Sequence, residues 1–167
     1  MLIREIEIKD AENLINLIKG VEAKSNYMLM EAGERKTTHE QQRKHLERLE
    51  KQNNSTIFVA EQEGNLIGYL IAIGGSVKRT KHSAYIVVGI LEQNRGQGVG
   101  TALFKRVDEW AKSHHITRLE LTAVTNNEAG VALYKKSGFE IEGTKRNSLM
   151  IDGTFYDEYY MSKLLPF

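Results

Sequence analysis

One short segment of this 167-residue chain limits its possible folds more than any other. It reads Arg95-Gly96-Gln97-Gly98-Val99-Gly100-Thr101 and joins an apolar, β-prone stretch, Ser83–Leu91, to a stretch with apolar residues at helical spacing, Val99–Ser113. Glycines let a backbone approach a ligand closely, and the free N–H groups and dipole of a helix N-terminus attract an anion. The segment therefore predicts a strand, loop and helix that bind phosphate or pyrophosphate through backbone atoms. A flexible glycine-rich turn without a ligand is the simpler alternative.

Two common phosphate-binding motifs do not fit this loop. A Walker A loop requires Lys and then Ser or Thr after its last glycine, whereas Gly100 is followed by Thr101 and Ala102. A Rossmann fingerprint requires a third glycine three residues after the second, and Thr101 stands at that position. A nucleotide-binding module is therefore only a weak alternative.

The remaining sequence predicts strands and helices in an order typical of a mixed sheet. Alternating or β-branched apolar runs predict strands at Leu2–Ile8, Thr56–Ala60, Leu66–Ile73, Ser83–Leu91 and Arg118–Thr125, and a hairpin with a type I′ turn at Leu149–Tyr156. Helical spacing and capping residues predict helices from Asp10 to Gly20, over Thr38–Lys51, over Val99–Ser113, and from Asn126 or Asn127 to Gly138. The order βααβββαβαββ indicates the α/β class, with a mostly antiparallel mixed sheet and helices on both faces.

Composition excludes several classes of protein and site. The net charge of +1 gives no basis for a nucleic-acid partner, and no apolar run approaches the ~20 residues of a membrane span, so no membrane is expected as a partner. The chain has no Cys, and no two of its five His have a metal spacing, so we expect no metal. No linker divides the chain. We expect one domain, residues 1–167, located in the cytoplasm.

Two motifs resemble signatures of one enzyme family. Arg95, Gly98 and Gly100 match the fixed positions of Gln/Arg-x-x-Gly-x-Gly/Ala, the acyl-CoA-binding signature of the GNAT superfamily of N-acetyltransferases. Downstream, Asn127 followed by Leu133-Tyr134-Lys135-Lys136-Ser137-Gly138-Phe139 is similar to the second signature of that family. The two signatures occur in the family's order, and the resemblance covers roughly residues 56–141.

The resemblance implies a GNAT-like acyl-CoA N-acyltransferase fold and an enzyme that moves the acetyl group of acetyl-CoA to a primary amine. The acceptor would be a small molecule or a protein N-terminus, and residues 21–54, which carry no signature, would shape its pocket. A homodimer is one expected assembly. The alternative from another class is a non-catalytic acyl-CoA-binding sensor or partner-binding module of the same fold. The residues implied to bind acetyl-CoA are Val88, Gly89, Ile90, Arg95, Gly96, Gln97, Gly98, Val99, Gly100, Thr101 and Asn127.

The resemblance also implies which residues move protons. Tyr134 stands where the family has its usual general acid, which protonates the departing thiolate; packing of its ring is the structural alternative. Many members have a Glu five residues before the signature Asn, but Thr122 stands there. Glu120 lies two residues earlier on the same face of the predicted strand and is the candidate base. His82 and Tyr85 are the other candidates, and Asn127 has a second role open to it as a helix cap.

Overall fold

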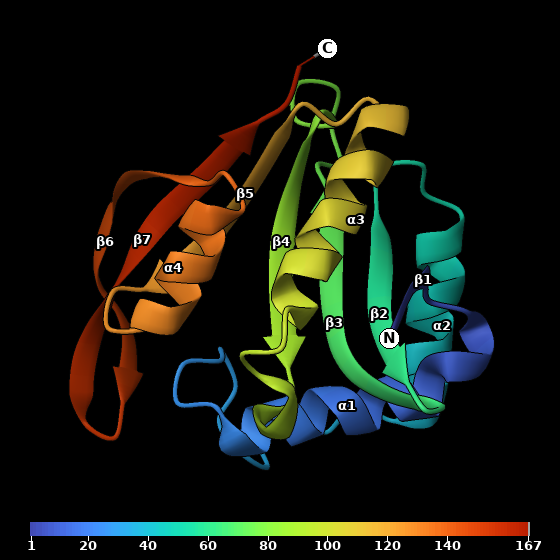
Figure 1. Cartoon of the computed structure of the whole chain (residues 1–167), viewed down its shortest axis with the longest axis horizontal. Helices are drawn as coiled ribbons and strands as arrows, with labels where there is room; N and C mark the ends of the chain where they lie inside the picture. The colour runs from blue at the N-terminus through green and yellow to red at the C-terminus, as the bar shows by residue number, and fades with distance from the viewer. Residues whose placement is uncertain (167) are drawn as a thin grey trace.

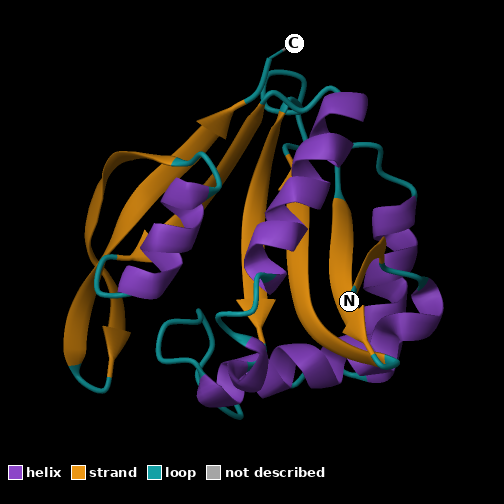
Figure 2. Cartoon of the chain, in the orientation of Figure 1, coloured by secondary structure: helices purple, strands orange, loops and turns teal. Residues whose placement is uncertain are grey.

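Seven strands form one sheet in the order β1-β2-β3-β4-β5-β7-β6, with four α-helices packed around it (Figures 1 and 2). The computed structural model describes residues 1–166. Every neighbouring pair of strands is antiparallel except β4 and β5, which are parallel. The strands are β1 (Leu2–Glu5), β2 (Thr56–Gln62), β3 (Asn65–Gly74), β4 (Ser83–Ile90), β5 (Arg118–Val124), β6 (Glu140–Ile151) and β7 (Thr154–Leu164). The helices are α1 (Ala11–Lys24), α2 (His39–Glu50), α3 (Val99–Ser113) and α4 (Glu128–Lys136), with short 3-10 turns η1 (Ile8–Asp10) and η2 (Glu92–Asn94).

The two faces of the sheet carry separate cores. Phe58 of β2 packs with α3 and with the residues of α4 that face the sheet, whereas its neighbours Ile57 and Val59 pack with α1 and α2. This alternation is what a strand buried on both faces requires. The predicted α/β class, the mostly antiparallel sheet and the helices on both faces are thus confirmed. Within residues 1–166, no helix is long and apolar enough to cross a bilayer.

The parallel pair β4–β5 is joined over a short distance only. Its register runs from Ser83↔Arg118 to Tyr85↔Glu120 and then stops, although β4 remains paired with β3 as far as Ile90. Beyond Tyr85 the two strands diverge, and the gap between their ribbons widens toward the end of β4 (Figure 1). The second half of β4 therefore has a free edge, whose backbone groups can pair with something other than a strand.

Gly20 does not end the first helix, contrary to the sequence prediction. α1 continues to Lys24, and Val21 and Glu22 in its last turn are buried. A Cβ atom at Gly20 would lie 3.1 Å from Cδ2 of Leu91, so this glycine permits a close approach of α1 to the end of β4. Burial of the apolar face of the helix outweighs the intrinsic cost of about 1 kcal/mol for an internal glycine.

The start of α1 also differs from the prediction. Asp10 occupies the N-cap position of α1, but its carboxylate does not cap that helix. It accepts instead from Arg4 at 2.8 and 3.0 Å and, as part of the capping box of η1, from the N–H of Glu7 at 2.8 Å. β1 ends at Glu5 rather than at Ile8, where η1 begins. The ion pair also holds the pKa of Asp10 below its usual range, mainly through the Arg4 hydrogen bonds.

The remaining boundaries agree closely with the sequence. The spans of α3 and of the predicted helix Val99–Ser113 are the same, and Thr38 caps α2 through the N–H of Gln41. The turn residues Asp152 and Gly153 both have positive φ, 50° and 79°, as a type I′ hairpin requires. The hairpin itself is much longer than predicted, because β6 begins at Glu140 and β7 ends at Leu164.

Candidate active site

The glycine-rich loop adopts a backbone shape that other residues rarely take. Gly96 and Gly98 have φ of 74° and 82°, in the left-handed region. A Cβ atom on either residue would meet no atom within 4 Å, so the space above both is open. Gln97 between them donates from Nε2 to the carbonyl of Gln93 at 3.2 Å, and Arg95 is exposed. The loop thus offers an open, backbone-lined concavity.

The N-terminus of α3 begins at this concavity. Gly98 is the N-cap, and the N–H of Ala102 makes the first helical bond, to the carbonyl of Gly98 at 3.1 Å. The N–H groups of Val99, Gly100 and Thr101 come before that bond and have no partner inside the helix. Within the described chain no side chain caps α3, and its first turn carries no acidic residue. These features fit a phosphate or pyrophosphate group.

Gly100 has a packing role that differs from that of the other two glycines. A Cβ atom there would lie 2.6 Å from Cδ2 of Leu133 in α4 and 3.2 Å from Cδ1 of Ile90. The glycine therefore lets α4 approach α3 and the end of β4. Its N–H group still belongs to the first turn of the helix, so both roles are compatible.

The free edge of β4 carries Val88, Gly89 and Ile90. Gly89 lies opposite Tyr69 of β3 in the antiparallel register. A Cβ atom at Gly89 would lie 2.6 Å from ring carbons of Tyr69 and 2.7 Å from its hydroxyl oxygen. Glycine is therefore needed here so that the Tyr69 ring can cover the β4 backbone on the face that carries α1 and α2.

Tyr134 reaches the same region from the opposite face. Its ring packs edge-on against Phe104 and Phe139, with centroid distances of 5.8 and 6.5 Å. Burial raises the pKa of Tyr134 to about 12, and the nearby hydroxyl of Tyr85 adds to the rise. The packing interpretation is thus correct for the ring, while the hydroxyl lies near Tyr85 at the point where β4 and β5 separate.

Beside this point lies a cavity of about 460 Å³, on the face of the sheet opposite α3 and α4. Tyr85 and Thr122 share a hydrogen bond between their hydroxyl oxygens, at 2.8 Å, across the gap between β4 and β5. Glu120 lies on the same strand face, and its Oε2 accepts from Nε of Arg118 at 3.0 Å. The residues that line the cavity are Tyr85, Arg118, Glu120, Leu121, Thr122, Glu142, Tyr160 and Met161.

Arg118 forms ion pairs with two carboxylates. Besides Glu120, it binds Glu142 of β6 at 2.6 Å through Nη2. Hydrogen bonds from Arg118 hold the pKa of Glu142 below its usual range. Glu120 thus enters the site as an ion-paired carboxylate, while His82 is exposed, lies before β4 and does not line the cavity.

Asn127 caps α4. Its Oδ1 accepts from the N–H of Gly130 at 3.1 Å. The helix ends at Lys136, and Gly138 just after its C-cap has a φ of 99° and donates to the carbonyl of Lys135, as is typical of a left-handed helix terminus. Of the two roles considered for Asn127, the structure contains the cap.

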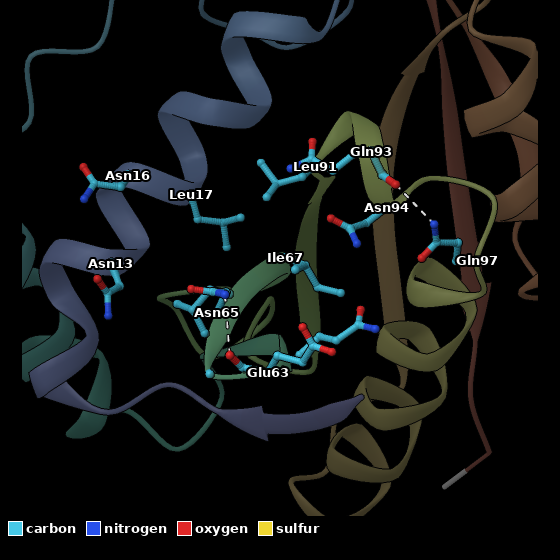
Figure 3. A pocket seen from close by; sticks show the side chains of 13 residues that line it. Asn13, Asn16, Leu17, Glu63, Asn65, Ile67, Leu91, Gln93, Asn94 and Gln97 are labelled. Carbon is cyan, nitrogen blue, oxygen red and sulfur yellow. Dashed lines mark hydrogen bonds between the residues drawn. The ribbon is translucent and has the colours of Figure 1, made fainter.

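A larger hollow, about 640 Å³, lies on the outer side of the glycine-rich loop (Figure 3). It is bordered by α1, by the β2–β3 turn and by the segment before α3, and most of its polar side chains are amides. Gln97 is the only residue that it shares with the predicted site. Its lining residues include Asn13, Asn16, Gln62, Asn65, Gln93, Asn94 and Gln97, with Glu63 as the only titratable one.

A buried ion pair near Tyr69 was not predicted. Glu22, in the last turn of α1, is 3% exposed and binds Arg35 of the following loop. Burial raises the pKa of Tyr69, and the charge of Glu22 adds to this, so the pair lies close to that hydroxyl. The available signal was a charged residue four positions after Ile18, on the apolar face of α1.

Comparison with known proteins agrees with this geometry. The model of the Acetyltransferase (GNAT) family matches residues 26–139. The L-amino acid N-acetyltransferase AaaT of Escherichia coli is 31% identical over 111 residues, which cover 64% of this chain and 67% of that protein.

Two solved structures cover nearly the whole chain. An acetyltransferase of the GNAT family from Streptococcus pneumoniae superposes with a TM-score of 0.94 at 30% identity, over 99% of both chains. A ribosomal-protein-alanine N-acetyltransferase from Brucella melitensis superposes with a TM-score of 0.86 at 25% identity, over 99% of this chain and 100% of that one. The open edge of β4, the uncapped start of α3 and these matches lead to one conclusion: the chain belongs to the GNAT family and is an acetyl-CoA-dependent N-acetyltransferase.

Proposed function

We propose that acetyl-CoA binds along the gap between β4 and β5 and that the acceptor amine enters from the face that carries α1 and α2. The observation that carries this proposal is the free edge of β4, which leads through η2 and the glycine-rich loop to the uncapped N-terminus of α3. The backbone of Val88, Gly89 and Ile90 would pair with the pantetheine arm as an added strand does. The loop from Arg95 to Thr101 would hold the pyrophosphate through its N–H groups.

The reaction joins the acceptor nitrogen to the thioester carbonyl carbon and breaks the carbon–sulfur bond. The nitrogen loses one proton, and the departing thiolate gains one. Bringing both reactants to one gap converts a bimolecular encounter into a positioned one. We assign the proton for the thiolate to Tyr134, whose hydroxyl lies where β4 and β5 separate.

The pKa of Tyr134, about 12, refines this role. A thiol has a pKa near ~8.5, so complete proton transfer from Tyr134 to a free thiolate is uphill by about 5 kcal/mol. The hydroxyl therefore acts first as a hydrogen-bond donor that strengthens as charge builds on sulfur. The raised pKa also keeps the proton on Tyr134 throughout the neutral and mildly alkaline range.

We assign removal of the acceptor's proton to Glu120. Its carboxylate lines the cavity at the same strand face as Thr122, where the family's more common Glu would be. The bonded hydroxyls of Tyr85 and Thr122 line the same cavity and would pass the proton to this carboxylate by a relay. Asn127 keeps a proposed contact with the pantetheine arm beside its capping role.

Two kinds of acceptor remain candidates. AaaT is named for L-amino acids, and the Brucella melitensis protein for a ribosomal-protein alanine. A panel of free amino acids, polyamines and short peptides, with free-thiol release from acetyl-CoA as readout, separates these classes. If thiol release requires one class of amine, that class is the acceptor. Binding of acetyl-CoA without release for any amine would contradict the proposed acetyl transfer.

Three expectations from the sequence stay predictions. They are the single domain of residues 1–167, the location in the cytoplasm and the homodimer. Light scattering on the purified protein measures the assembly: a mass of twice 19.0 kDa is the expected result for a dimer.

A further inference from the structure

The ion pair between Glu22 and Arg35 orients a guanidinium group in the region that we assign to the acceptor. A carboxylate that is 3% exposed requires a close partner, because an unpaired buried charge is costly. Nε of Arg35 donates to both carboxylate oxygens of Glu22 at 3.1 Å, and Nη2 donates to Oε2 at 2.8 Å. The pairing uses the Nε–Nη2 side of the guanidinium.

The other side of the guanidinium is free. Nη1 of Arg35 has no hydrogen-bond partner in the described part of the chain, and the side chain is 26% exposed. The exposed carboxylate of Glu34 is near enough for its charge to add to the raised pKa of Arg35, but it makes its hydrogen bond with the N–H of Glu31, at 3.1 Å, and none with Arg35. The Nη1–Nη2 edge is thus fixed in direction by a buried carboxylate and available to a second one.

This edge lies on the acceptor side of β4. The Tyr69 hydroxyl lies in the field of both charges: Glu22 raises its pKa and Arg35 lowers it, beside the larger effect of burial. Its ring covers Gly89 on the free part of β4. In Figure 1 the loop that holds Arg35, between α1 and α2, lies below the open end of the gap between β4 and β5.

Tyr69 itself is buried, with 1% of its surface exposed. The part of this cluster that solvent reaches is the guanidinium of Arg35, whose side chain is 26% exposed. Tyr69 thus links the charged pair, which acts on its hydroxyl, to the backbone of β4 at Gly89, which its ring covers.

We propose that Arg35 binds a carboxylate of the acceptor, with Glu22 as the residue that positions it, so that the acceptor is a free amino acid. This inference rests on the proposed direction of acceptor entry. A planar guanidinium edge suits a carboxylate, whereas the N-terminus of a protein carries a peptide carbonyl at the same place and offers no charge to it. The free edge thus selects against protein N-termini.

The test compares acceptors that differ only at the carboxylate. Free-thiol release is measured for the twenty standard L-amino acids, then for the amide of the best one and for the amine left by its decarboxylation. The wild type is expected to prefer the amino acid over both by about 10- to 100-fold in kcat/KM, the range for hydrogen bonds between charged groups. Arg35→Gln is expected to reduce that ratio to near 1.

Two further variants distinguish recognition of the acceptor carboxylate by Arg35 from a purely structural role of this residue. Glu22→Gln/Arg35→Gln removes both charges, leaves no unpaired buried carboxylate and is expected to lose the preference equally. Arg43→Gln removes an exposed, ion-paired arginine of α2 and is expected to keep it. Equal losses for amino acid and amine in the Arg35 variants would mean a structural role and overturn the proposal.

A wild type without preference for the carboxylate would also overturn this proposal, while leaving acetyl transfer to amines intact. No thiol release with any amine would instead contradict the proposed function itself. The two failures are therefore distinguishable in one set of assays.

Discussion

The loop that leads into α3 and the loop that leaves α1 both border β4, yet they present different atoms to it. The first offers backbone N–H groups at a left-handed Gly98, and the second offers the side chain of Arg35 held by Glu22. A phosphate site made of backbone requires particular φ values and therefore glycines at fixed spacing. A site made of side chains requires only that two groups meet in space. A site made of backbone therefore leaves a motif in the sequence, whereas a site made of side chains does not.

The largest expected effect tests whether Tyr134 donates a proton to the departing thiolate of the donor. Tyr134→Phe keeps the ring that packs against Phe104 and removes the hydroxyl. We expect kcat to fall by about 100-fold or more, the usual contribution of a positioned acid, while the dissociation constant for acetyl-CoA changes less than about 2-fold. Thiol release and calorimetric titration measure the two quantities. Unchanged kcat would show that another group supplies the proton.

The next effect tests whether the acceptor side is held by its ion pair. Arg35→Gln leaves the Glu22 carboxylate buried without its partner, and we expect the free energy of unfolding to fall by about 3 kcal/mol. Urea unfolding with an unchanged m-value measures this. Glu22→Gln/Arg35→Gln is expected to recover at least half of the loss. A single variant as stable as wild type would mean that the pair does not hold the loop.

A smaller effect tests the proposed pyrophosphate site in the loop from Arg95 to Thr101. Gly98→Val places a branched side chain in the open space above the loop, at a φ of 82°. We expect the KM for acetyl-CoA to rise about 10-fold or more, because the side chain occupies the space of the proposed pyrophosphate.

The matched control for this variant is Gly153→Val. Gly153 has a φ of 79°, open space around it and a place in the β6–β7 turn, far along the chain from the loop. Both variants carry a backbone strain of about 1–2 kcal/mol, but only the first lies at the proposed donor site. Equal KM values for acetyl-CoA in the two variants would contradict the proposed pyrophosphate site in this loop.

Glu120→Gln tests the proposed base with an expected fall of about 10-fold in kcat, below the usual range for such catalysis because its carboxylate is half-exposed and ion-paired. Glu142→Gln removes the other carboxylate bound to Arg118 and serves as the matched variant. A larger loss in Glu142→Gln than in Glu120→Gln would shift the assignment from Glu120 to the ion-pair network.

The smallest expected effect is a flat pH profile. Because the pKa of Tyr134 is raised to about 12, its proton stays bound well above pH 10, where an ordinary tyrosine is half ionised. We therefore expect kcat at saturating acceptor to show no descending limb between pH 8 and pH 10. A decline centred near pH 9 would indicate a different acid.

The sequence predicts some elements of the fold closely and others poorly, for physical reasons. The bounds of α3 follow from its apolar spacing, and the hairpin turn follows from Asp152 and Gly153. The prediction that Gly20 ends the first helix is wrong because this glycine permits a close contact with Leu91, which no local pattern reveals. Most of β6 was missed because it is exposed along both faces and lacks alternation.

The candidate site follows the same division. The loop from Arg95 to Thr101 and Tyr134 carry motifs, so their neighbourhood in space was predictable. Glu22 and Arg35 lie 13 residues apart across an irregular loop, and no spacing rule brings them together. The hydroxyl bond between Tyr85 and Thr122 likewise joins two strands whose pairing the sequence does not specify.

The brief pairing of β4 with β5 has a mechanical consequence. Three rungs, from Ser83↔Arg118 to Tyr85↔Glu120, join the half of the sheet built from β1 to β4 to the half built from β5, β7 and β6. If the pantetheine arm pairs with the free edge of β4 as we propose, the bound donor stabilises this junction between the two halves. The amide hydrogens of β4 beyond Tyr85 that point to the free edge, and not those bonded to β3, then exchange with solvent in the empty enzyme and become protected when it is loaded. In this sense the co-substrate completes the sheet. When it departs as free CoA, the junction between β4 and β5 becomes less stable before the next cycle.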